Sequence, residues 1–176
     1  MDIHDFESLY HQHFHKIFRT AYLVTGDYQL AEDAAQEAFL KAFSKIETLR
    51  DRDKFSSWVS VIAANYSVDL LRKNKKLIFT EKTDTQPDSS QESSPHDHWE
   101  HKENLHEVRE ALQKLDPDER ILLVLKYFNE LSIKDIASMH QVSTGTIKSR
   151  LFRAREKLRI LLQPSPDLKR QISKAK

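Results

Sequence analysis

The side chains best suited to bind a ligand lie between Ser143 and Arg159, where six basic residues stand beside a single acid. At about 100° per residue, a helix over this stretch gathers its apolar residues on one side: Ile147, Leu151, Ala154 and Leu158. The opposite side carries Gly145, Lys148, Ser149, Phe152, Arg153 and Glu156. Cations of this kind pair with phosphates, and an aromatic ring among them is suited to pack on a base or a thymine methyl. We therefore expect this helix to contact DNA, and the alternative is a solvated face with one incidental aromatic.

A helix-turn-helix is the element that would position this face. A short helix over residues 132–139 precedes a three-residue turn, His140-Gln141-Val142, and a longer helix that Ser143 caps and that runs to about Leu162. The turn has Met139-His140-Gln141 where many such motifs carry glycine, and a left-handed non-glycine residue costs about 1 kcal/mol. Upstream, the sequence from Leu105 and a helix start at Asp116-Pro117, with a predicted N-cap at Asp116, complete a C-terminal helical domain.

The first 76 residues predict three further helices. The first runs from about Asp5 to Thr25 and ends at Gly26, where a left-handed residue is expected. The second is capped by Asp27, runs to about Thr48 and buries an alanine stripe. A charged loop over residues 49–54 leads to the third helix, which runs from about Ser56 to Asn74, includes Trp58 and Tyr66 in its packed side, and ends in a basic cluster.

Composition separates the two domains. Residues 77–104 contain seven acids and two basic residues. Within them, residues 80–99 are rich in Ser, Asp, Gln and Pro, so this stretch buries too little apolar surface to order itself. We predict an all-α fold with two small helical domains joined by a flexible linker. The predicted boundaries are 1–78 for the first domain, 79–104 for the acidic linker, 105–163 for the second domain and 164–176 for a basic tail.

Several function classes are disfavoured. The chain has no cysteine, which rules out disulfides, thiolate zinc sites and a cysteine nucleophile and fits a reducing cytoplasm. The N-terminus is acidic and has no apolar h-region, so we expect no secretory signal, and no run reaches the roughly 18–20 apolar residues of a membrane span. We find no phosphate-binding loop, nucleophile elbow or paired-acid motif, and so expect no catalytic residue, cofactor or metal.

Ordered motifs over nearly the whole chain resemble sigma-70-family factors of the extracytoplasmic-function (ECF) group. Residues 131–137 (LSIKDIA) and 145–155 (GTIKSRLFRAR) are similar to region 4 of that family. Residues 31–39 (AEDAAQEAF) are similar to region 2.2, and residues 55–58 (FSSW), 62–65 (IAAN) and 69–73 (DLLRK) to regions 2.3 and 2.4. The resemblance implies a transcription initiation factor that binds core RNA polymerase and recognises the −35 and −10 elements of promoter DNA.

The resemblance also implies residue roles. The −35 contacts would be Lys148, Ser149, Phe152 and Arg153, with Thr146 beside them and with Arg150 and Arg155 reaching phosphates or neighbouring carboxylates. At the −10 element, Asn65 and the loop 49–54, which includes Arg50, would hold a flipped base, while Arg72, Lys73, Lys75 and Lys76 grip phosphates. The alternative for Asn65 is a buried amide that bonds to backbone.

Partners follow from the same resemblance. Asp33, Gln36, Glu37 and Leu40, on the face opposite the alanine stripe, would dock on a coiled coil of the clamp in the largest polymerase subunit, unless this is only a solvated acidic face. The family also implies a contact with the polymerase flap and an anti-sigma factor, which can be membrane-anchored.

Two rival interpretations remain. A metal-binding protein would use His11, His13 and His15, or His96, His98 and His101, but alternate positions on a helix point to different sides and the second cluster has no supporting ligands. A stand-alone helix-turn-helix regulator with a ligand-sensing N-terminal domain would bind duplex DNA without polymerase.

Overall fold

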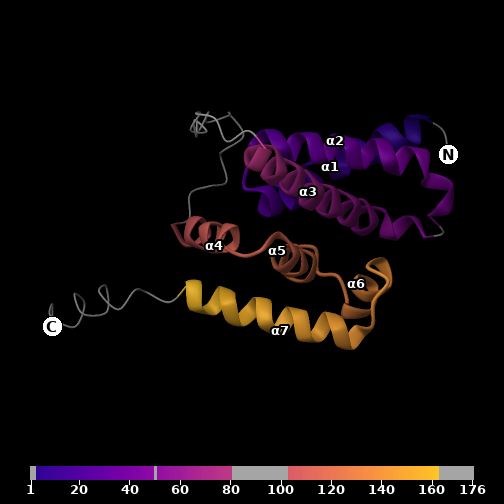
Figure 1. The fold of residues 1–176 in the computed structure, drawn as a ribbon. Helices are drawn as coiled ribbons and strands as arrows, with labels where there is room; N and C mark the ends of the chain where they lie inside the picture. The colour runs from indigo at the N-terminus through magenta and orange to yellow at the C-terminus, as the bar shows by residue number, and fades with distance from the viewer. Residues whose placement is uncertain (1–2, 50, 81–102, 163–176) are drawn as a thin grey trace, which may run out of the picture.

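The computed structural model describes residues 3–49, 51–80 and 103–162, and every regular element within these ranges is helical, as predicted. Figure 1 shows two stacked bodies. The N-terminal body consists of α1 (Ile3–Thr25), α2 (Tyr28–Ser44) and α3 (Phe55–Thr80). The C-terminal body consists of α4 (Glu103–Gln113), α5 (Pro117–Leu123), α6 (Ile133–Met139) and α7 (Thr144–Leu161). The basic tail and the linker between α3 and α4 lie outside the described residues.

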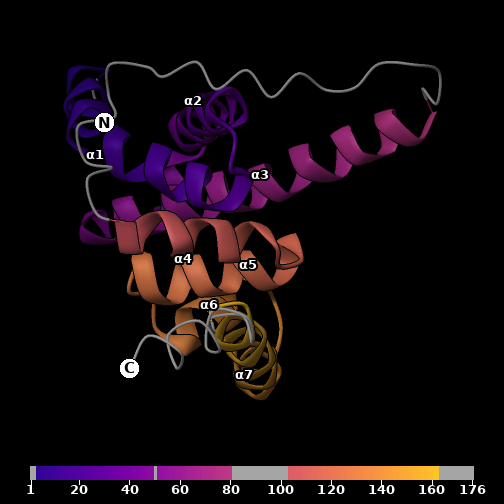
Figure 2. The ribbon, with the colours of Figure 1, turned by 90° about the vertical axis from the view of Figure 1, so that its left-hand side faces the viewer.

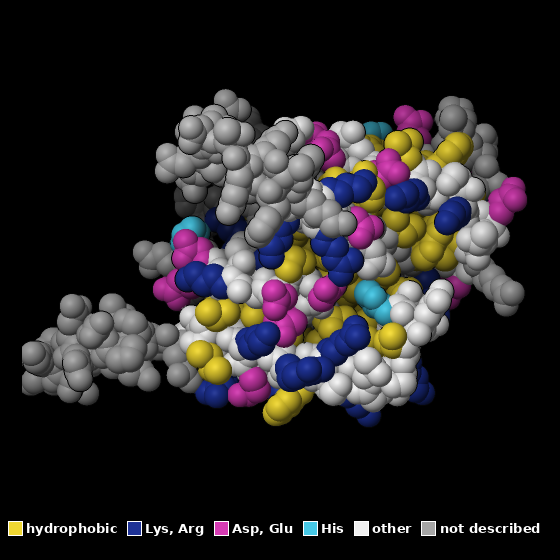
Figure 3. Space-filling view, in the orientation of Figure 1, with side chains coloured by type: hydrophobic (Ala, Val, Ile, Leu, Met, Phe, Trp, Pro, Cys, Tyr) yellow, Lys and Arg dark blue, Asp and Glu magenta, His cyan; other side chains and the backbone are white. Residues whose placement is uncertain are grey.

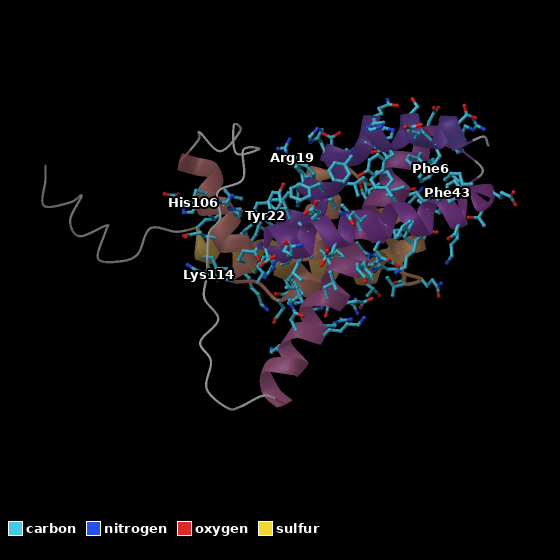
Figure 4. The ribbon with its side chains drawn as sticks, turned by 90° about the horizontal axis from the view of Figure 1, so that it is seen from above. Phe6, Arg19, Tyr22, Phe43, His106 and Lys114 are labelled. Atoms are coloured by element: carbon cyan, nitrogen blue, oxygen red, sulfur yellow. The ribbon has the colours of Figure 1, made fainter. Side chains whose placement is uncertain are left out.

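The N-terminal body depends on close approach of α2 to its two neighbours. The alanines of α2 are fully buried, and because they are small they let the backbones of α1 and α3 come near. Aromatic rings fill one end of this bundle, where the centroids of Tyr10 and Phe39 are 4.7 Å apart and those of Phe6 and Phe43 are 4.9 Å apart. Figure 4 shows Phe6 and Phe43 together at this end. Edge-to-face pairs of this kind stabilise beyond their buried area.

The turn between α1 and α2 has the predicted residues. Gly26 has φ of +71°, and its N–H donates to the carbonyl oxygen of Tyr22 at 2.8 Å, which ends α1. Asp27 then caps α2 by accepting a hydrogen bond from the backbone N–H of Leu30 at 2.8 Å.

Two helix ends differ from the prediction. The second helix ends at Ser44 rather than near Thr48, and the chain tightens into a 3₁₀ turn, η1 (Ile46–Thr48), as is frequent at helix ends. A second 3₁₀ turn, η2 (Arg52–Lys54), leads into α3. The third helix continues to Thr80, past the predicted end at Asn74, because no Gly or Pro interrupts the sequence there. Figure 2 shows its last turns projecting beyond the bundle.

In the C-terminal body, serines cap both helices of the helix-turn-helix. Ser132 accepts from the N–H of Asp135, and Ser143 accepts from the N–H of Thr146, both at 3.1 Å. The prediction for Asp116 is half right: it occupies the N-cap position before Pro117, but its side chain makes no capping hydrogen bond. Its carboxylate lies 3.8 Å from Nζ of Lys157 instead. After α5 the chain continues as a π-helical turn, η3 (Val124–Phe128).

The two bodies share one hydrophobic core. Val24 of α1 and Val61, Ala64 and Val68 of α3 are buried in the same cluster as the apolar residues of the C-terminal body: Leu112, Leu115, Ile121, Leu122, Leu123, Val124, Leu125, Leu131, Ile136, Ala137, Ile147, Leu151 and Ala154. Burial of apolar surface contributes about 25 cal/mol per Å², so this shared cluster favours the packed arrangement.

Polar contacts help to fix the orientation of the two bodies relative to each other. Arg120 is buried and donates to carbonyl oxygens at the ends of two helices, those of Leu112 and Gln113 in α4 and that of Val24 in α1. Beside it, the side-chain amide of Gln113 donates to the carbonyl oxygen of Leu23 at 3.1 Å. The Thr20 hydroxyl lies 3.1 Å from Oδ1 of Asn129, and both residues are buried.

The two glycines provide a matched test of this junction. A Cβ on Gly26 would combine left-handed strain with a 2.5 Å approach to the Gln113 side chain, whereas a Cβ on Gly145 would meet only Oγ of Ser143 at 3.6 Å. We expect Gly26→Ala to lower the free energy of unfolding by about 1–2 kcal/mol. Gly145→Ala should leave it unchanged or raise it by up to about 1 kcal/mol. Urea unfolding measures the change in free energy for each variant. Equal effects of Gly26→Ala and Gly145→Ala would contradict the role given to Gly26 at the junction.

Candidate nucleic-acid interface

The recognition helix α7 packs on α6 as the sequence predicts. Ile136 of α6 and Ile147 of α7 are completely buried, and Leu151 and Ala154 continue the buried side. The turn between them contains a left-handed non-glycine residue, Gln141, with φ of +54°. The N–H of Val142 closes the turn by donating to the carbonyl oxygen of Ala137 at 3.0 Å. The chain therefore accepts a small backbone cost at the turn and retains the helix-turn-helix geometry.

The side chains that the resemblance assigns to the −35 element lie together on the outer face of α7, and Arg153, at one edge of that face, also lines the cleft between the two bodies. Lys148, Ser149, Phe152 and Arg153 are exposed, and Phe152 is 61% exposed. Within the described residues, no carboxylate forms an ion pair with Lys148, Arg150 or Arg153. Figure 3 shows a group of basic side chains over α7. These cations are free to pair with phosphates, and the ring of Phe152 is free to pack on a base.

Three other residues of α7 lie away from this group or are bonded within the protein. Thr146 is half-buried, and its hydroxyl lies 2.9 Å from Oγ of the capping residue Ser143. Arg155 lies on another side of α7, in a groove described below. Lys157 lies 2.6 Å from Oε1 of Glu119, and this hydrogen bond raises the pKa of Lys157. These contacts leave the outer face of α7, rather than the whole helix, as the candidate DNA surface.

The residues assigned to the −10 element fall in different surroundings. Asn65 is exposed on α3, so the alternative of a buried, backbone-bonded amide is wrong. Lys73 and Lys75 are also exposed. Arg50 lies outside the described residues, as does the side chain of Lys76.

Arg72 is already paired. Its guanidinium donates to both carboxylate oxygens of Asp118 in α5, at 2.8 and 2.9 Å, and lies 3.7 Å from Asp69 on its own helix. One predicted phosphate contact of the N-terminal body is therefore bonded to the C-terminal body. Nothing in the sequence pattern indicates this pair, because exposed charges carry no sign of their partner.

The loop before α3 borders a cavity of about 190 Å³, lined by Leu9, Ile46, Glu47, Leu49, Arg52 and Phe55. Its lining is otherwise apolar, and Glu47 and Arg52 add one negative and one positive charge. Asn65 is not among its lining residues and follows Phe55 by ten positions, which is about 15 Å along a helix. The structure thus places Asn65 and this cavity at separate points along α3 rather than in one pocket.

The proposed docking face of α2 has the predicted exposure. Leu40 is 66% exposed, and Asp33 and Gln36 are exposed beside it, while Glu37 is half-buried with its carboxylate 3.4 Å from Nζ of Lys41. Sequence reasoning missed Phe43, which is 47% exposed and three residues beyond Leu40 on the same face. The i, i+3 spacing of the two apolar residues was the available signal. Trp58 and Tyr66, predicted as core, are half-buried against the N-terminal core clusters.

Two further hollows were not predicted. A cleft of about 420 Å³ between the bodies is lined by Arg72, Asp118, Glu119, Leu122, Arg150 and Arg153. An open apolar groove of about 630 Å³ on the C-terminal body is lined by Leu123, Tyr127, Arg155, Glu156, Leu158, Arg159 and Leu162. The available signal for the groove was Leu162, which follows Leu158 of the predicted apolar side by four residues and so continues that side beyond the end of α7.

The histidines do not form a metal site in the described part of the chain, where no group of three or more His, Cys, Asp or Glu residues could hold an ion. His11 and His15 are exposed on α1 and His13 is half-buried. The cluster of His96, His98 and His101 lies outside the described residues. No helix in the part of the chain that the structure describes is both long and apolar enough to cross a membrane.

This geometry defines an all-α helix-turn-helix protein with a second candidate nucleic-acid surface on a separate helical body. Family models agree with both halves: Sigma-70 region 2 matches residues 9–77, and Sigma-70 region 4 matches residues 105–158. The chain belongs to the sigma-70 family, in its ECF group. It is an RNA polymerase sigma factor, and its function is promoter-specific transcription initiation.

Individual relatives support this assignment. The chain is 32% identical over 152 residues to the ECF RNA polymerase sigma factor SigW of Bacillus subtilis, covering 82% of this chain and 81% of SigW. It is 31% identical over 176 residues to the RNA polymerase sigma-H factor of Pseudomonas aeruginosa, covering 90% and 86%. The sigma factor RpoE of Bartonella quintana, solved with the anti-sigma factor NepR, has the same fold, with a TM-score of 0.69, 24% identity and coverage of 93% and 99%. The matches indicate no enzyme family.

The turn of the helix-turn-helix should respond to acid. His140 is half-buried, burial lowers its pKa, and the charge of Arg150 lowers it further while Asp118 opposes the shift. The folded protein therefore disfavours protonation, so stability is full above the unfolded-state pKa of about 6.5 and declines as the pH falls below it.

Urea midpoints at pH 7.5 and 5.5 measure this decline, and His140→Gln should make it smaller. His13, whose pKa is lowered by burial and by Lys16, remains in both proteins and accounts for part of the residual slope. An identical decline in the wild type and in His140→Gln would contradict the assignment.

Proposed function

We propose that the C-terminal body, residues 105–163, is the −35 reader and that α7 reads the element with the ring of Phe152 and the polar groups around it. The assigned residues are Thr146, Lys148, Ser149, Arg150, Phe152 and Arg153. The exposure of Phe152 among unpaired cations carries this proposal. A large aromatic side chain 61% exposed on a helix whose other side is fully buried is poorly explained by folding alone.

We propose that the N-terminal body, residues 1–78, engages the −10 element. Asn65 would read a base edge with its exposed amide, which offers both a donor and an acceptor. Arg50, Arg72, Lys73, Lys75 and Lys76 would contact the strand backbone. The cavity beside Leu49 and Phe55 is a second candidate for base capture, because its apolar walls suit a base face and Arg52 and Glu47 can meet its edge.

We propose two contacts with core polymerase. The exposed face of α2, with Asp33, Gln36, Glu37, Leu40 and Phe43, suits the coiled coil of the clamp in the largest subunit. The apolar groove on the C-terminal body suits the flap, because Tyr127, Leu158 and Leu162 offer apolar surface while Arg155 and Arg159 border it. An anti-sigma partner is a further proposal, supported by the bound NepR in the structure of RpoE.

We infer that the chain performs no catalysis of its own and acts in the cytoplasm, where polymerase and template are found. Polymerase supplies the chemistry of RNA synthesis. The part assigned to this protein is to choose the start site.

The −35 assignment is tested with single substitutions in reconstituted transcription. Phe152→Ala and Arg153→Ala should each reduce transcription from a −35-dependent promoter by about ten-fold or more, since a good base contact is worth roughly 1–3 kcal/mol. Asn65→Ala should leave −35 binding intact and impair strand opening, measured by permanganate reactivity of unpaired thymines. Ile160→Ala is the matched control, because Ile160 is also 61% exposed on α7 but lies eight residues beyond Phe152, about 12 Å further along the helix and past the assigned residues. Full −35 recognition by both Phe152→Ala and Arg153→Ala would overturn the assignment.

Polymerase docking is tested by co-purification with core enzyme. Leu40→Ala should weaken binding by about 1–2 kcal/mol, since it removes a buried apolar contact from the interface. The same Ile160→Ala protein controls for loss of an exposed aliphatic side chain. Wild-type protein that fails to bind core polymerase would refute the docking proposal as a whole, whereas unchanged binding by Leu40→Ala alone would remove only that residue.

A further inference from the structure

Three arginines from two helices line one cleft. The cleft has a volume of about 420 Å³, and its lining consists of Arg72 of α3, Asp118, Glu119 and Leu122 of α5, and Arg150 and Arg153 of α7. Figure 3 shows basic side chains on the facing edges of the two bodies, with acidic side chains between them. Pockets for small organic ligands usually measure about 300–1,000 Å³, so the cleft is large enough to hold one.

Each carboxylate of the cleft already has a cation within the protein. Asp118 accepts hydrogen bonds from the guanidinium of Arg72 at 2.8 and 2.9 Å, and Oε1 of Glu119 lies 2.6 Å from Nζ of Lys157. A paired carboxylate repels an approaching anion much less than a free one, because the charge of its partner offsets its own. The net charge of the cleft is therefore set by the two arginines of α7.

The guanidinium groups of these two arginines have no carboxylate partner within the ranges that the structure describes. Nε of Arg153 donates to its own helix, 3.5 Å from the carbonyl oxygen of Ser149, and this contact leaves the terminal nitrogens unused. A guanidinium is a planar fork of donors that fits a phosphate. Because Arg150 and Arg153 are three positions apart on a helix, they are neighbours on its surface and can hold two linked phosphates.

His140, in the turn before α7, lies close to the same charges. Its Nε2 is buried and has no hydrogen-bond partner among the described residues. Burial lowers the pKa of His140, the charge of Arg150 lowers it further, and Asp118 opposes the shift. The imidazole is therefore within electrostatic range of a cation and a carboxylate of the cleft, and its titration reports a change of charge there.

We propose that this cleft binds a small diphosphate anion, inorganic or carried by a nucleotide, with Arg150 and Arg153 as the phosphate-binding residues. Arg72 neutralises Asp118 on the opposite wall, and Leu122 offers apolar surface to the rest of the ligand. The proposal goes beyond the proposed function, because the free protein binds this ligand without polymerase or promoter. The ligand and a −35 phosphate compete for the same guanidinium groups.

Calorimetric titration of the full chain with inorganic pyrophosphate tests the site. Arg150→Ala and Arg153→Ala should each weaken binding about five- to ten-fold, because each removes charged hydrogen bonds to phosphate. Lys148→Ala is the matched control, since Lys148 is an exposed cation of the same helix that does not line the cleft. Its substitution should change the affinity by less than about two-fold.

A substitution of the opposite sign separates the cleft from a general basic surface. Asp118→Asn removes a negative charge from the lining and frees the guanidinium of Arg72, so it should tighten pyrophosphate binding about three-fold or more. Asp69→Asn is its control, because Asp69 lies 3.7 Å from the same Arg72 but does not line the cleft. The gain of affinity should be clearly smaller for Asp69→Asn, and equal affinities of Asp118→Asn and the wild type would contradict the site.

The titration of His140, followed by NMR of its imidazole, gives a second readout. An anion bound at Arg150 offsets the charge that lowers the pKa of His140, so pyrophosphate should raise this pKa. The rise should be absent in Arg150→Ala, which lacks both the charge and the ligand contact. A pKa that does not respond to saturating pyrophosphate in the wild type would place the anion elsewhere and overturn the proposal.

Comparison of anions identifies the ligand class. Tighter binding of ADP than of pyrophosphate supports a nucleotide in the cleft, and equal binding supports recognition of the diphosphate alone. Sulfate or monophosphate that binds as tightly as pyrophosphate at matched ionic strength, or equal losses in Lys148→Ala and Arg150→Ala, would indicate an adventitious ion only and overturn the site. Because these titrations contain neither polymerase nor promoter, their failure leaves the −35 and docking assignments intact.

Discussion

A single buried guanidinium lies where both halves of the molecule join. Arg120 donates to carbonyl oxygens of Leu112, Gln113 and Leu115 within the C-terminal body and to that of Val24 at the end of α1. These carbonyls belong to the last turns of α1 and α4 or follow them, where helices leave acceptors unpaired and where the macrodipole is negative. Burial lowers the pKa of Arg120 to about 10, and Asp116 opposes the shift, so the group stays charged at neutral pH.

The rest of the structure is arranged around this charge. Removal of the guanidinium would leave several buried carbonyl oxygens unpaired at a cost of about 1–3 kcal/mol each. Gly26 follows α1 directly, and its missing Cβ gives the Gln113 side chain space beside Arg120. The same docking brings α5 under α3, and with it Asp118 under Arg72. A helix-end interaction in the core thereby determines which side chains meet in the cleft at the surface.

Local features could be predicted from the sequence because each depends on residues close together in the chain. Periodicity identified the buried sides of α1, α2 and α7, and Gly26, Asp27 and Ser143 were recognised from the chemistry of helix ends. The exposure of Phe152 and Leu40 followed from their departure from the buried stripes. Asp116 failed as a side-chain cap because its carboxylate turns toward Lys157, a residue 41 positions away.

The packing of one body on the other could not be predicted in this way. The apolar character of the third helix shows that Val61 and Val68 must be covered by another element, but it does not identify that element. Arg120 and Asp118 look like ordinary charged residues at the start of a helix. For the same reason the loop cavity and Asn65 were expected in one place, although the length of α3 separates them. The motifs of regions 2 and 4 identify the family from the sequence, whereas the structure shows how the two bodies pack on each other.

The central claim is that Arg120, bonded to carbonyl oxygens at the ends of α1 and α4, holds the two bodies together. Spin labels on cysteines placed at Asn74 of α3 and Ser138 of α6, both exposed, can report the distance between the bodies by pulsed electron resonance. We expect one short distance distribution in the wild type and longer, broader distances in Arg120→Met, which leaves the buried carbonyl oxygens without their donor. The same short distance distribution in a folded Arg120→Met protein would contradict the account.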